Sequence, residues 1–330
     1  MSNKVTIYDV AKKADVSLAT VSRVINNSAS VKQATKERVL EAIKELNFVP
    51  NAVAQGLASN KTTNIALIVP EASFSYISKI INGVVDVVYI YNYNVILHST
   101  NFGQFEIDKI VDRVVSSRTD GVIILSSELT TKALDQFSKY NIPVTIVGTT
   151  INGPLRTSVY VDYEKVCYES VKDYLDKGKD KIYFIDGDYN RFIVSDMLTG
   201  IKRAYKDKGL RFKGHLKVSD SFSKSYEQLK KHMQENEVDL YLGARDSLAI
   251  AAMNAALDLN KVIPDDLEII GFNNTKYSRM SRPQLSTIHV PLYEMGAIAA
   301  RHMTKLLNNE EVTSANHELD CYLIKRESTK

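Results

Sequence analysis

From Asn64 onward, short apolar runs alternate with amphipathic helical stretches, and this alternation constrains the fold more than any other feature of the chain. Runs that are apolar at consecutive positions are typical of parallel strands buried between helices. They lie at residues 65–69, 95–98, 122–125, 144–147, 182–185, 240–242 and 268–270. The helical stretches between them include residues 77–91, 106–117 and 131–140. This order predicts α/β units whose sheets carry helices on both faces.

The length of 330 residues fits about two such units at roughly 150 residues per domain. A last helix over residues 292–307 and a strand near residues 319–324 are expected to close the chain. With 44% hydrophobic and 25% charged residues, the composition is that of an ordinary globular protein. We therefore predict two α/β units of similar size, preceded by a different N-terminal module.

That N-terminal module reads as three short helices between residues 5 and 46. Ser17 stands where an N-cap would begin the second helix, and Thr35 does so before residues 36–46. Residues 1–61 hold nine Lys and Arg against five Asp and Glu, whereas the rest of the chain is nearly neutral. A small basic module joined to a neutral body is expected when one end of a protein meets phosphate.

Residues 6–26 have the pattern of a helix-turn-helix, in which a helix, a tight turn and a second helix follow one another. Apolar residues including Val10 and Val21 are expected to hold the two helices together. Polar residues that remain outward can bind phosphate oxygens, and Arg23 can reach a guanine edge. These polar residues are Thr6, Tyr8, Ser17, Thr20, Ser22 and Asn26. The alternative is a plain helical hairpin with solvated hydroxyls.

Residues 50–58 place small side chains beside one leucine, Leu57, in a short segment that is able to form a helix. Such a composition suits the minor groove, where Leu57 could wedge between base steps and kink the duplex. Packing of Leu57 on the body of the protein is the alternative. The Lys61-Thr62-Thr63 sequence that follows suggests a hinge.

Three motifs in series resemble the LacI/GalR family of repressors: residues 6–11, residues 16–26 and residues 50–58. The resemblance implies an all-α helix-turn-helix headpiece, a hinge helix that orders on operator DNA, and an α/β core of two periplasmic-binding-protein-like subdomains. It also implies a homodimer on a pseudo-palindromic operator. The implied boundaries are 1–49 for the headpiece, 50–61 for the hinge and linker, 62–161 plus 290–318 for the core N-subdomain, and 162–289 plus 319–330 for the C-subdomain.

Carried over position by position, the family's groove-reading residues are Leu18, Ala19 and Arg23. Its minor-groove residues correspond to Ala54, Leu57 and Ala58, with Asn51 at the start of the same segment.

Further segments, at residues 56–63, 272–275, 282–286 and 291–297, resemble the branch of the family that represses carbon catabolite genes. That resemblance implies that serine-phosphorylated HPr, a phosphocarrier protein, is the corepressor. The residues expected to bind it are Tyr293, Glu294, Ala297, Ile298 and Arg301, with the Arg301 guanidinium on the phosphate. Tyr322 replaces an arginine of this branch, and Arg326 remains nearby. The alternative is that Arg301 is a solvated helix charge.

A diffusible sugar or sugar phosphate is the alternative effector, and its cleft would include Arg191, Arg245, Asp246 and Asn273. Met197 stands where sugar-responsive members carry a ligand-binding arginine, which argues against a tight sugar site. Arg191 and Arg245 could hold a phosphorylated ligand, or they could be surface charges.

We expect no enzyme, because the phosphate-loop, dinucleotide and nucleophile-elbow motifs are absent and the six histidines have no ligand or triad spacing. Cys167 and Cys321 lack metal-site spacing and are expected to be buried apolar residues. We therefore expect no cofactor and no metal. The sequence shows no signal-peptide pattern and no apolar run long enough for a membrane helix, so we expect a cytoplasmic protein without a membrane partner.

Overall fold

A computed structural model describes residues 5–26, 30–49, 61–70, 74–100, 104–125, 131–187 and 191–330, with the backbone alone at 104–108, 131–132 and 191–192. The chain divides into two compact units, Met1–Thr62 and Thr63–Lys330. In the described residues of both units, no helix is both long enough and apolar enough to cross a membrane.

The first unit contains the three predicted helices, α1 (Ile7–Lys13), α2 (Leu18–Ile25) and α3 (Gln33–Glu45). They enclose a small core in which Val10, Val21 and Val39 have no exposed surface. The prediction that Thr35 caps the third helix is wrong. The chain is already helical at Gln33, because the backbone N–H groups of Thr35 and Lys36 both donate to the carbonyl of Lys32.

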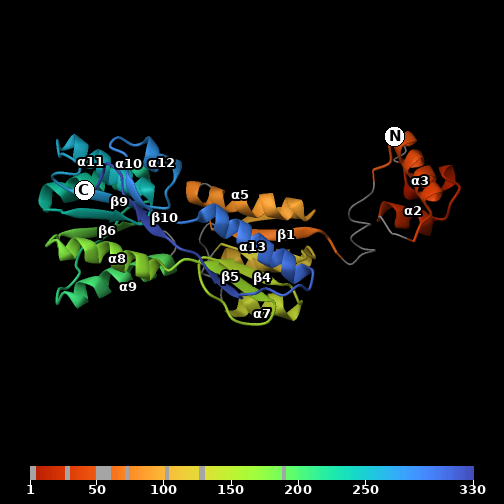
Figure 1. Ribbon diagram of the computed structural model, residues 1–330, viewed down its shortest axis with the longest axis horizontal. Helices are drawn as coiled ribbons and strands as arrows, with labels where there is room; N and C mark the ends of the chain where they lie inside the picture. Colours follow the sequence, from red (N-terminus) through yellow and green to blue (C-terminus); the bar gives the residue numbers. More distant parts are fainter. Residues whose placement is uncertain are drawn as a thin grey trace. The chain divides into compact units, whose positions relative to one another are not determined.

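The second unit has two lobes, each built on a six-stranded sheet (Figure 1). We call the first sheet and its helices the first lobe. In spatial order its strands are β11 (Asn316–Glu318), β5 (Arg156–Tyr160), β4 (Val144–Val147), β3 (Gly121–Ile124), β1 (Asn64–Val69) and β2 (Asn94–Ser99), all parallel to their neighbours. Its helices are α5 (Ser75–Ile90), α6 (Gln104–Ser116), α7 (Thr131–Lys139) and α13 (Leu292–Leu307).

Successive residues of β1 point to opposite faces of the first sheet and pack in two different hydrophobic cores. Ile65 and Leu67 pack with α5 and α13, whereas Ala66 and Ile68 pack with α6 and α7 on the other face. Because both faces are covered, the central strands are apolar at every position, as the sequence predicted.

The second lobe repeats this plan. In spatial order its strands are β12 (Tyr322–Ile324), β10 (Ser286–His289), β9 (Glu268–Phe272), β8 (Leu240–Gly243), β6 (Ile182–Asp186) and β7 (His215–Lys217). Its helices are α8 (Tyr163–Asp176), α9 (Arg191–Asp207), α10 (Phe222–Glu235), α11 (Asp246–Asp258) and α12 (Lys276–Met280). Only the described pair β10 and β12 is antiparallel. The predicted α/β architecture with parallel sheets is confirmed.

Two strand predictions need correction. Residues 95–98 were expected to be buried on both faces, but they belong to β2 at the edge of the sheet, where Leu97 is 46% exposed. The strand expected near residues 319–324 is present but shorter, as β12, and a further strand that was not expected, β11, lies just before it in the other sheet. β11 pairs with β5 in the first lobe, and β12 pairs with β10 in the second, so residues 319–321 pass from one lobe to the other.

The chain crosses between the lobes at two further places, from β5 to α8 and from β10 to α13 (Figure 1). Three crossings join two sheets whose strands are interleaved in sequence. The carboxyl ends of β8 and β9 lie on the same edge of their sheet, which is where α/β folds place their ligands.

Candidate nucleic-acid interface and regulatory surface

The second helix of the first unit begins at a well-formed cap. The Ser17 hydroxyl accepts a hydrogen bond from the backbone N–H of Thr20 at 3.2 Å, and the two side-chain oxygens lie 2.9 Å apart. An N-cap serine satisfies a backbone donor that a helix start would otherwise leave unpaired. The predicted cap at Ser17 is confirmed, and the first turn of α2 is fixed by its own side chains.

The first helix begins with a second cap that the sequence reading missed. The Asp9 carboxylate accepts from the backbone N–H of Thr6 at 2.8 Å and from its hydroxyl at 2.7 Å. These hydrogen bonds lower the pKa of Asp9. The Thr-x-x-Asp spacing was the available signal. The hydroxyl proton of Thr6 is thus already engaged, although its oxygen can still accept.

A short turn separates the two helices. Asp15 adopts a positive φ of 49°, and the N–H of Val16 donates to the carbonyl of Ala11 at 3.1 Å. Val21 and Val24 point into the core, which leaves the opposite side of α2 outward. A helix held in this way can enter the major groove with its first residues leading.

The described residues that the sequence assigned to DNA are mostly on the surface. Tyr8 is 68% exposed, and Arg23 is exposed at the last turn of α2. The exposed members of the set are Thr6, Tyr8, Ser17, Leu18, Ala19, Arg23 and Asn26, while Thr20 and Ser22 are half-buried. The four minor-groove candidates, Asn51, Ala54, Leu57 and Ala58, lie outside the described residues.

In the second unit, α13 carries the residues assigned to the corepressor. Tyr293, Glu294 and Arg301 are exposed, whereas Ala297 and Ile298 are half-buried. The Tyr293 hydroxyl donates to Asp86 of α5 at 3.0 Å. Asp86 was not singled out from the sequence, because 207 positions separate it from its partner.

Arg326 cannot replace the arginine that this chain lacks at Tyr322. Its guanidinium donates to the carbonyl of Leu285 at 2.6 Å, the side-chain oxygen of Asn274 at 2.7 Å and the Ser278 hydroxyl at 3.1 Å. Tyr322 is exposed, and its ring packs against His289 with centroids 5.2 Å apart. Arg326 is thus engaged inside the second lobe.

The candidate cleft residues are tied to one another. Arg245 is 4% exposed, donates to Asp220 at 2.6 Å and to the Ser247 hydroxyl at 3.0 Å, and is therefore not a surface charge. Its guanidinium carbon lies 5.1 Å from the centre of the Phe74 ring. The side chain of Arg191 lies outside the described residues.

Asp246 and Asn273 are also buried. The Asp246 carboxylate accepts from the Thr275 N–H at 2.6 Å, the Thr275 hydroxyl at 2.7 Å and the Thr287 hydroxyl at 2.6 Å. Burial nevertheless raises the pKa of Asp246. Asn273 has a positive φ of 90° and donates its N–H to the carbonyl of Ile288. Met197 is fully packed in the core, as an apolar residue at that position should be.

Comparison with known proteins identifies the family to which this chain belongs. Residues 6–51 match the family of bacterial regulatory proteins of the lacI type, and residues 171–329 match the periplasmic binding protein-like domain. Catabolite control protein A of Priestia megaterium is 35% identical over 331 residues, which cover 99% of each chain. The chain belongs to the LacI family. It is a DNA-binding transcriptional regulator similar to the catabolite control proteins.

Further relatives support this assignment to the LacI family. Catabolite control protein A of Staphylococcus xylosus is 36% identical over 99% of both chains. The crystal structure of the transcription regulator CcpA of Lactococcus lactis is 28% identical, with a TM-score of 0.70 over 81% of this chain and 99% of that one. The lac repressor dimer bound to operator and the anti-inducer ONPF has a TM-score of 0.89 over 99% of both chains at 24% identity, which shows a shared fold.

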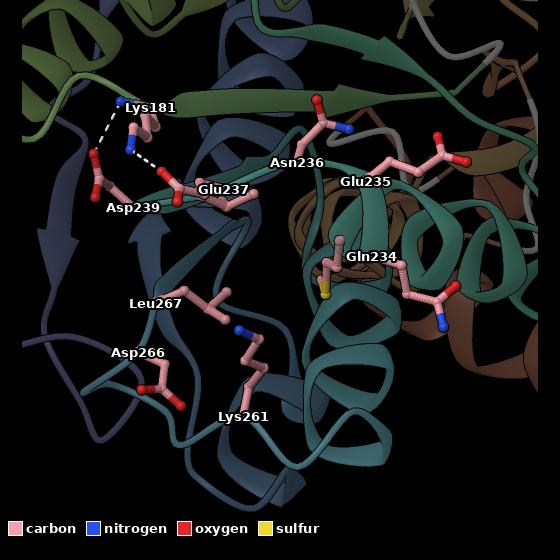
Figure 2. A pocket seen from close by; sticks show the side chains of 11 residues that line it. Lys181, Gln234, Glu235, Asn236, Glu237, Asp239, Lys261, Asp266 and Leu267 are labelled. Carbon is pink, nitrogen blue, oxygen red and sulfur yellow. Dashed lines mark hydrogen bonds and ion pairs between the residues drawn. The ribbon is translucent and has the colours of Figure 1, made fainter.

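A surface cavity of about 460 Å³ in this LacI-family chain lies at the amino ends of β8 and β9, away from the carboxyl ends that carry Asp246 and Asn273 (Figure 2). Four of its charged groups hold nearby backbone or one another, namely Lys181, Glu237, Asp239 and Asp266. Lys181 pairs with Glu237 and donates its N–H to Asp239, and Asp266 accepts from the N–H of Val262.

Proposed function

We propose that this chain is mainly a repressor of carbon catabolite genes, that it binds a pseudo-palindromic operator as a homodimer, and that serine-phosphorylated HPr is its corepressor. Relatives named catabolite control protein A, aligned over the full length, support the gene class. The observation that carries the corepressor proposal is the exposed Arg301 beside half-buried Ala297 and Ile298 on α13. A regulator of chromosomal genes would act in the cytoplasm.

The DNA-binding part of the proposal rests on the exposed side of α2. Leu18 and Ala19 lie in its first turn, and Arg23 is one turn further on. One headpiece of this size offers few base contacts, so two copies on two half-sites are needed for strong specific binding. We infer that Arg23 reads a guanine edge and that Tyr8, Ser17 and Asn26 contact phosphates.

Two groups of exposed apolar residues support the homodimer. Leu97 of β2 is 46% exposed and Tyr89 of α5 is 79% exposed in the first lobe, while Tyr277 and Met280 of α12 are 41% and 68% exposed in the second. Helices α5, α11 and α12 lie along the same edge of the unit (Figure 1). We infer that a second copy covers both groups through a twofold axis, because interfaces are where proteins gather exposed apolar side chains.

The α13 face suits a helix that bears phosphoserine. Ala297 and Ile298 offer small apolar contacts, and the Arg301 guanidinium can hold phosphate in a bidentate manner. Asp86 fixes the Tyr293 hydroxyl at the start of this face. Since Tyr322 stands in place of a second arginine and Arg326 is engaged elsewhere, we expect Arg301 to be the principal phosphate contact.

Calorimetry with serine-phosphorylated HPr tests this proposal. We expect binding to the wild type, no binding by unphosphorylated HPr, and at least a tenfold loss for Arg301→Ala. Arg211→Ala, an exposed arginine of the second lobe, is the matched control and should bind as the wild type does.

Equal binding by the wild type and Arg301→Ala would exclude Arg301 as the phosphate contact. If the wild type does not bind the phosphoprotein but its operator affinity responds to a sugar or sugar phosphate, the diffusible effector becomes the better proposal. The buried Arg245 argues against that outcome, since its guanidinium already pairs with Asp220 and lies beside the Phe74 ring.

A further inference from the structure

The segment from Lys202 to Lys217 is strongly basic. It holds seven Lys and Arg against one Asp, whereas Lys and Arg nearly balance Asp and Glu over the second unit as a whole. The segment comprises the last turns of α9, the loop that follows and the strand β7. Because the whole unit is nearly neutral, the rest of it is acidic, and positive charge is concentrated in this one segment.

Only some of these cations are paired. Helices α8 and α9 pack against each other on one side of the second sheet (Figure 1). Arg203 of α9 forms an ion pair with Glu164, and Lys208 forms one with Asp176 at the end of α8. Four other cations are exposed and have no hydrogen-bond or ion-pair partner in the part of the chain that the structure describes. We call these four residues the basic surface: Lys202, Lys206, Arg211 and Lys213.

The loop that carries Arg211 and Lys213 is held in place from two sides. The Phe212 ring packs on the Tyr205 ring of α9, with centroids 5.2 Å apart. Gly214 lies directly against the sheet, since a Cβ atom there would come 2.1 Å from a carbonyl oxygen of β6. These contacts keep the loop against the last turns of α9, so its two cations lie near those of the helix.

Protection of a sheet edge does not explain this surface. β7 is the outermost strand of its sheet, and lysines on such strands prevent pairing with other chains. Of the cations in the segment, however, only Lys217 belongs to β7. Lys202 and Lys206 lie one turn apart on the same side of α9, and the other two members of the basic surface lie in the loop. Four unpaired cations on a fixed backbone suit an anion with repeated charges.

We propose that the basic surface binds the phosphate backbone of double-stranded DNA without regard to sequence, so that the operator-bound protein holds a second duplex. Contacts of Lys and Arg with phosphates supply essentially all of non-specific DNA binding. Duplex DNA is also the polyanion nearest to a chain that its headpiece holds on an operator.

The aromatic residues of the segment favour a duplex over a single strand as the ligand. Tyr205 is buried and Phe212 is half-buried, and they pack against each other. Neither ring is free for the stacking of unpaired bases, which single-strand binding uses. The proposal rests on the DNA-binding identity of the chain and needs neither the dimer nor the corepressor.

Fluorescence anisotropy on the full chain tests this proposal. The protein is first saturated with unlabelled operator duplex, so that its headpieces are occupied, and a short labelled duplex without an operator sequence is the probe. We expect saturable binding of the probe. Its affinity should fall roughly a hundredfold between 50 and 200 mM salt, because about four phosphates are neutralised.

Removal of the basic surface should weaken probe binding at least tenfold and leave operator affinity unchanged. This variant carries Lys202→Gln, Lys206→Gln, Arg211→Gln and Lys213→Gln. The matched control removes four other exposed lysines of the second lobe, through Lys224→Gln, Lys231→Gln, Lys261→Gln and Lys325→Gln. The control should bind the probe within a few-fold of the wild type. All the substituted side chains are exposed, so both variants should fold, and operator affinity checks this.

No saturable binding of the probe by the wild type would overturn the proposal, as would equal losses in the two variants. If the probe binds only when operator is left out, the headpieces bind it and the basic surface does not. Poly-glutamate of the same charge is the second probe. If the wild type binds poly-glutamate more tightly than the duplex, the partner is an acidic protein and the assignment to DNA is wrong.

Discussion

Gly83 of α5 and Gly296 of α13 each face the backbone of the other helix. A Cβ atom at Gly83 would lie 2.1 Å from the carbonyl oxygen of Tyr293, and one at Gly296 would lie 2.1 Å from the carbonyl oxygen of Ile80. The two helices therefore touch through their backbones, and α13 cannot shift without α5. This contact positions Tyr293, at the start of the α13 face proposed to bind the corepressor.

Replacing Gly83 with alanine should disturb this crossing. The added methyl group meets a carbonyl oxygen rather than a flexible side chain, so the helices must separate. Overpacking of this kind costs about 1–3 kcal/mol of unfolding free energy. Urea denaturation of Gly83→Ala measures the loss, with Asn82→Ala, an exposed neighbour on the same helix, as the control. A loss no greater than that of the control would show that the helices do not cross so closely.

Arg23→Ala should relax the base preference of the protein. Loss of one bidentate contact to guanine costs roughly 1–3 kcal/mol of discrimination at that base pair. Competition with operators substituted at single positions measures this, and Lys44→Ala on α3, exposed on another helix, is the control. If Arg23→Ala weakens binding equally for all operators, then Arg23 contacts phosphate and reads no base.

The regular parts of the fold were predictable because they depend on local pattern. Helix α13 spans the residues expected from the sequence, and Ser17 caps α2 as its position suggested. Both signals lie within one or two turns of the chain. The same local reading placed Thr35 at a helix start and failed, since the backbone hydrogen bonds to Lys32 had already begun the helix.

Contacts between distant segments could not be predicted in this way. Arg245 was expected to be a surface charge or a ligand contact, but its side chain is buried and pairs with the partly exposed Asp220, 25 positions away. Residues 95–98 have the composition of a central strand, yet β2 lies at the edge of its sheet. Whether a strand is central or at an edge depends on the order of the strands in space, which the local sequence does not specify. The roles of the groove-reading and minor-groove residues stay predictions until DNA is bound.

Leu97→Asp should weaken the proposed homodimer. A charge in an apolar interface must be desolvated without a partner, which is strongly unfavourable. Leu155→Asp is the matched control, because Leu155 is 43% exposed and Leu97 is 46% exposed in the same lobe. Sedimentation velocity over a range of concentrations should show a dissociation constant at least tenfold higher for Leu97→Asp alone. Equal dissociation of both variants would place the interface elsewhere.

The stability of the second unit should fall with acid because of His302. This side chain of α13 is buried, and its Nδ1 has no hydrogen-bond partner in the described part of the chain. Burial lowers the pKa of His302 to about 4, with smaller effects of the nearby cations His317, Lys305 and Arg301. The unfolded chain therefore takes up this proton near pH 6.5 while the folded chain does not.

Proton uptake by the unfolded state alone favours unfolding. The contribution of neutral His302 to the free energy of unfolding is therefore complete above pH 6.5 and is lost as the pH falls to about 4. At about 1.4 kcal/mol for each unit between the two pKa values, the loss is at most about 3.5 kcal/mol. Urea denaturation between pH 7.5 and pH 4 measures it by comparing wild type with His302→Gln. The variant, which has no imidazole to titrate, should lose less stability over this interval. Parallel curves for the two proteins would mean that His302 is protonated in the folded state as readily as in the unfolded one.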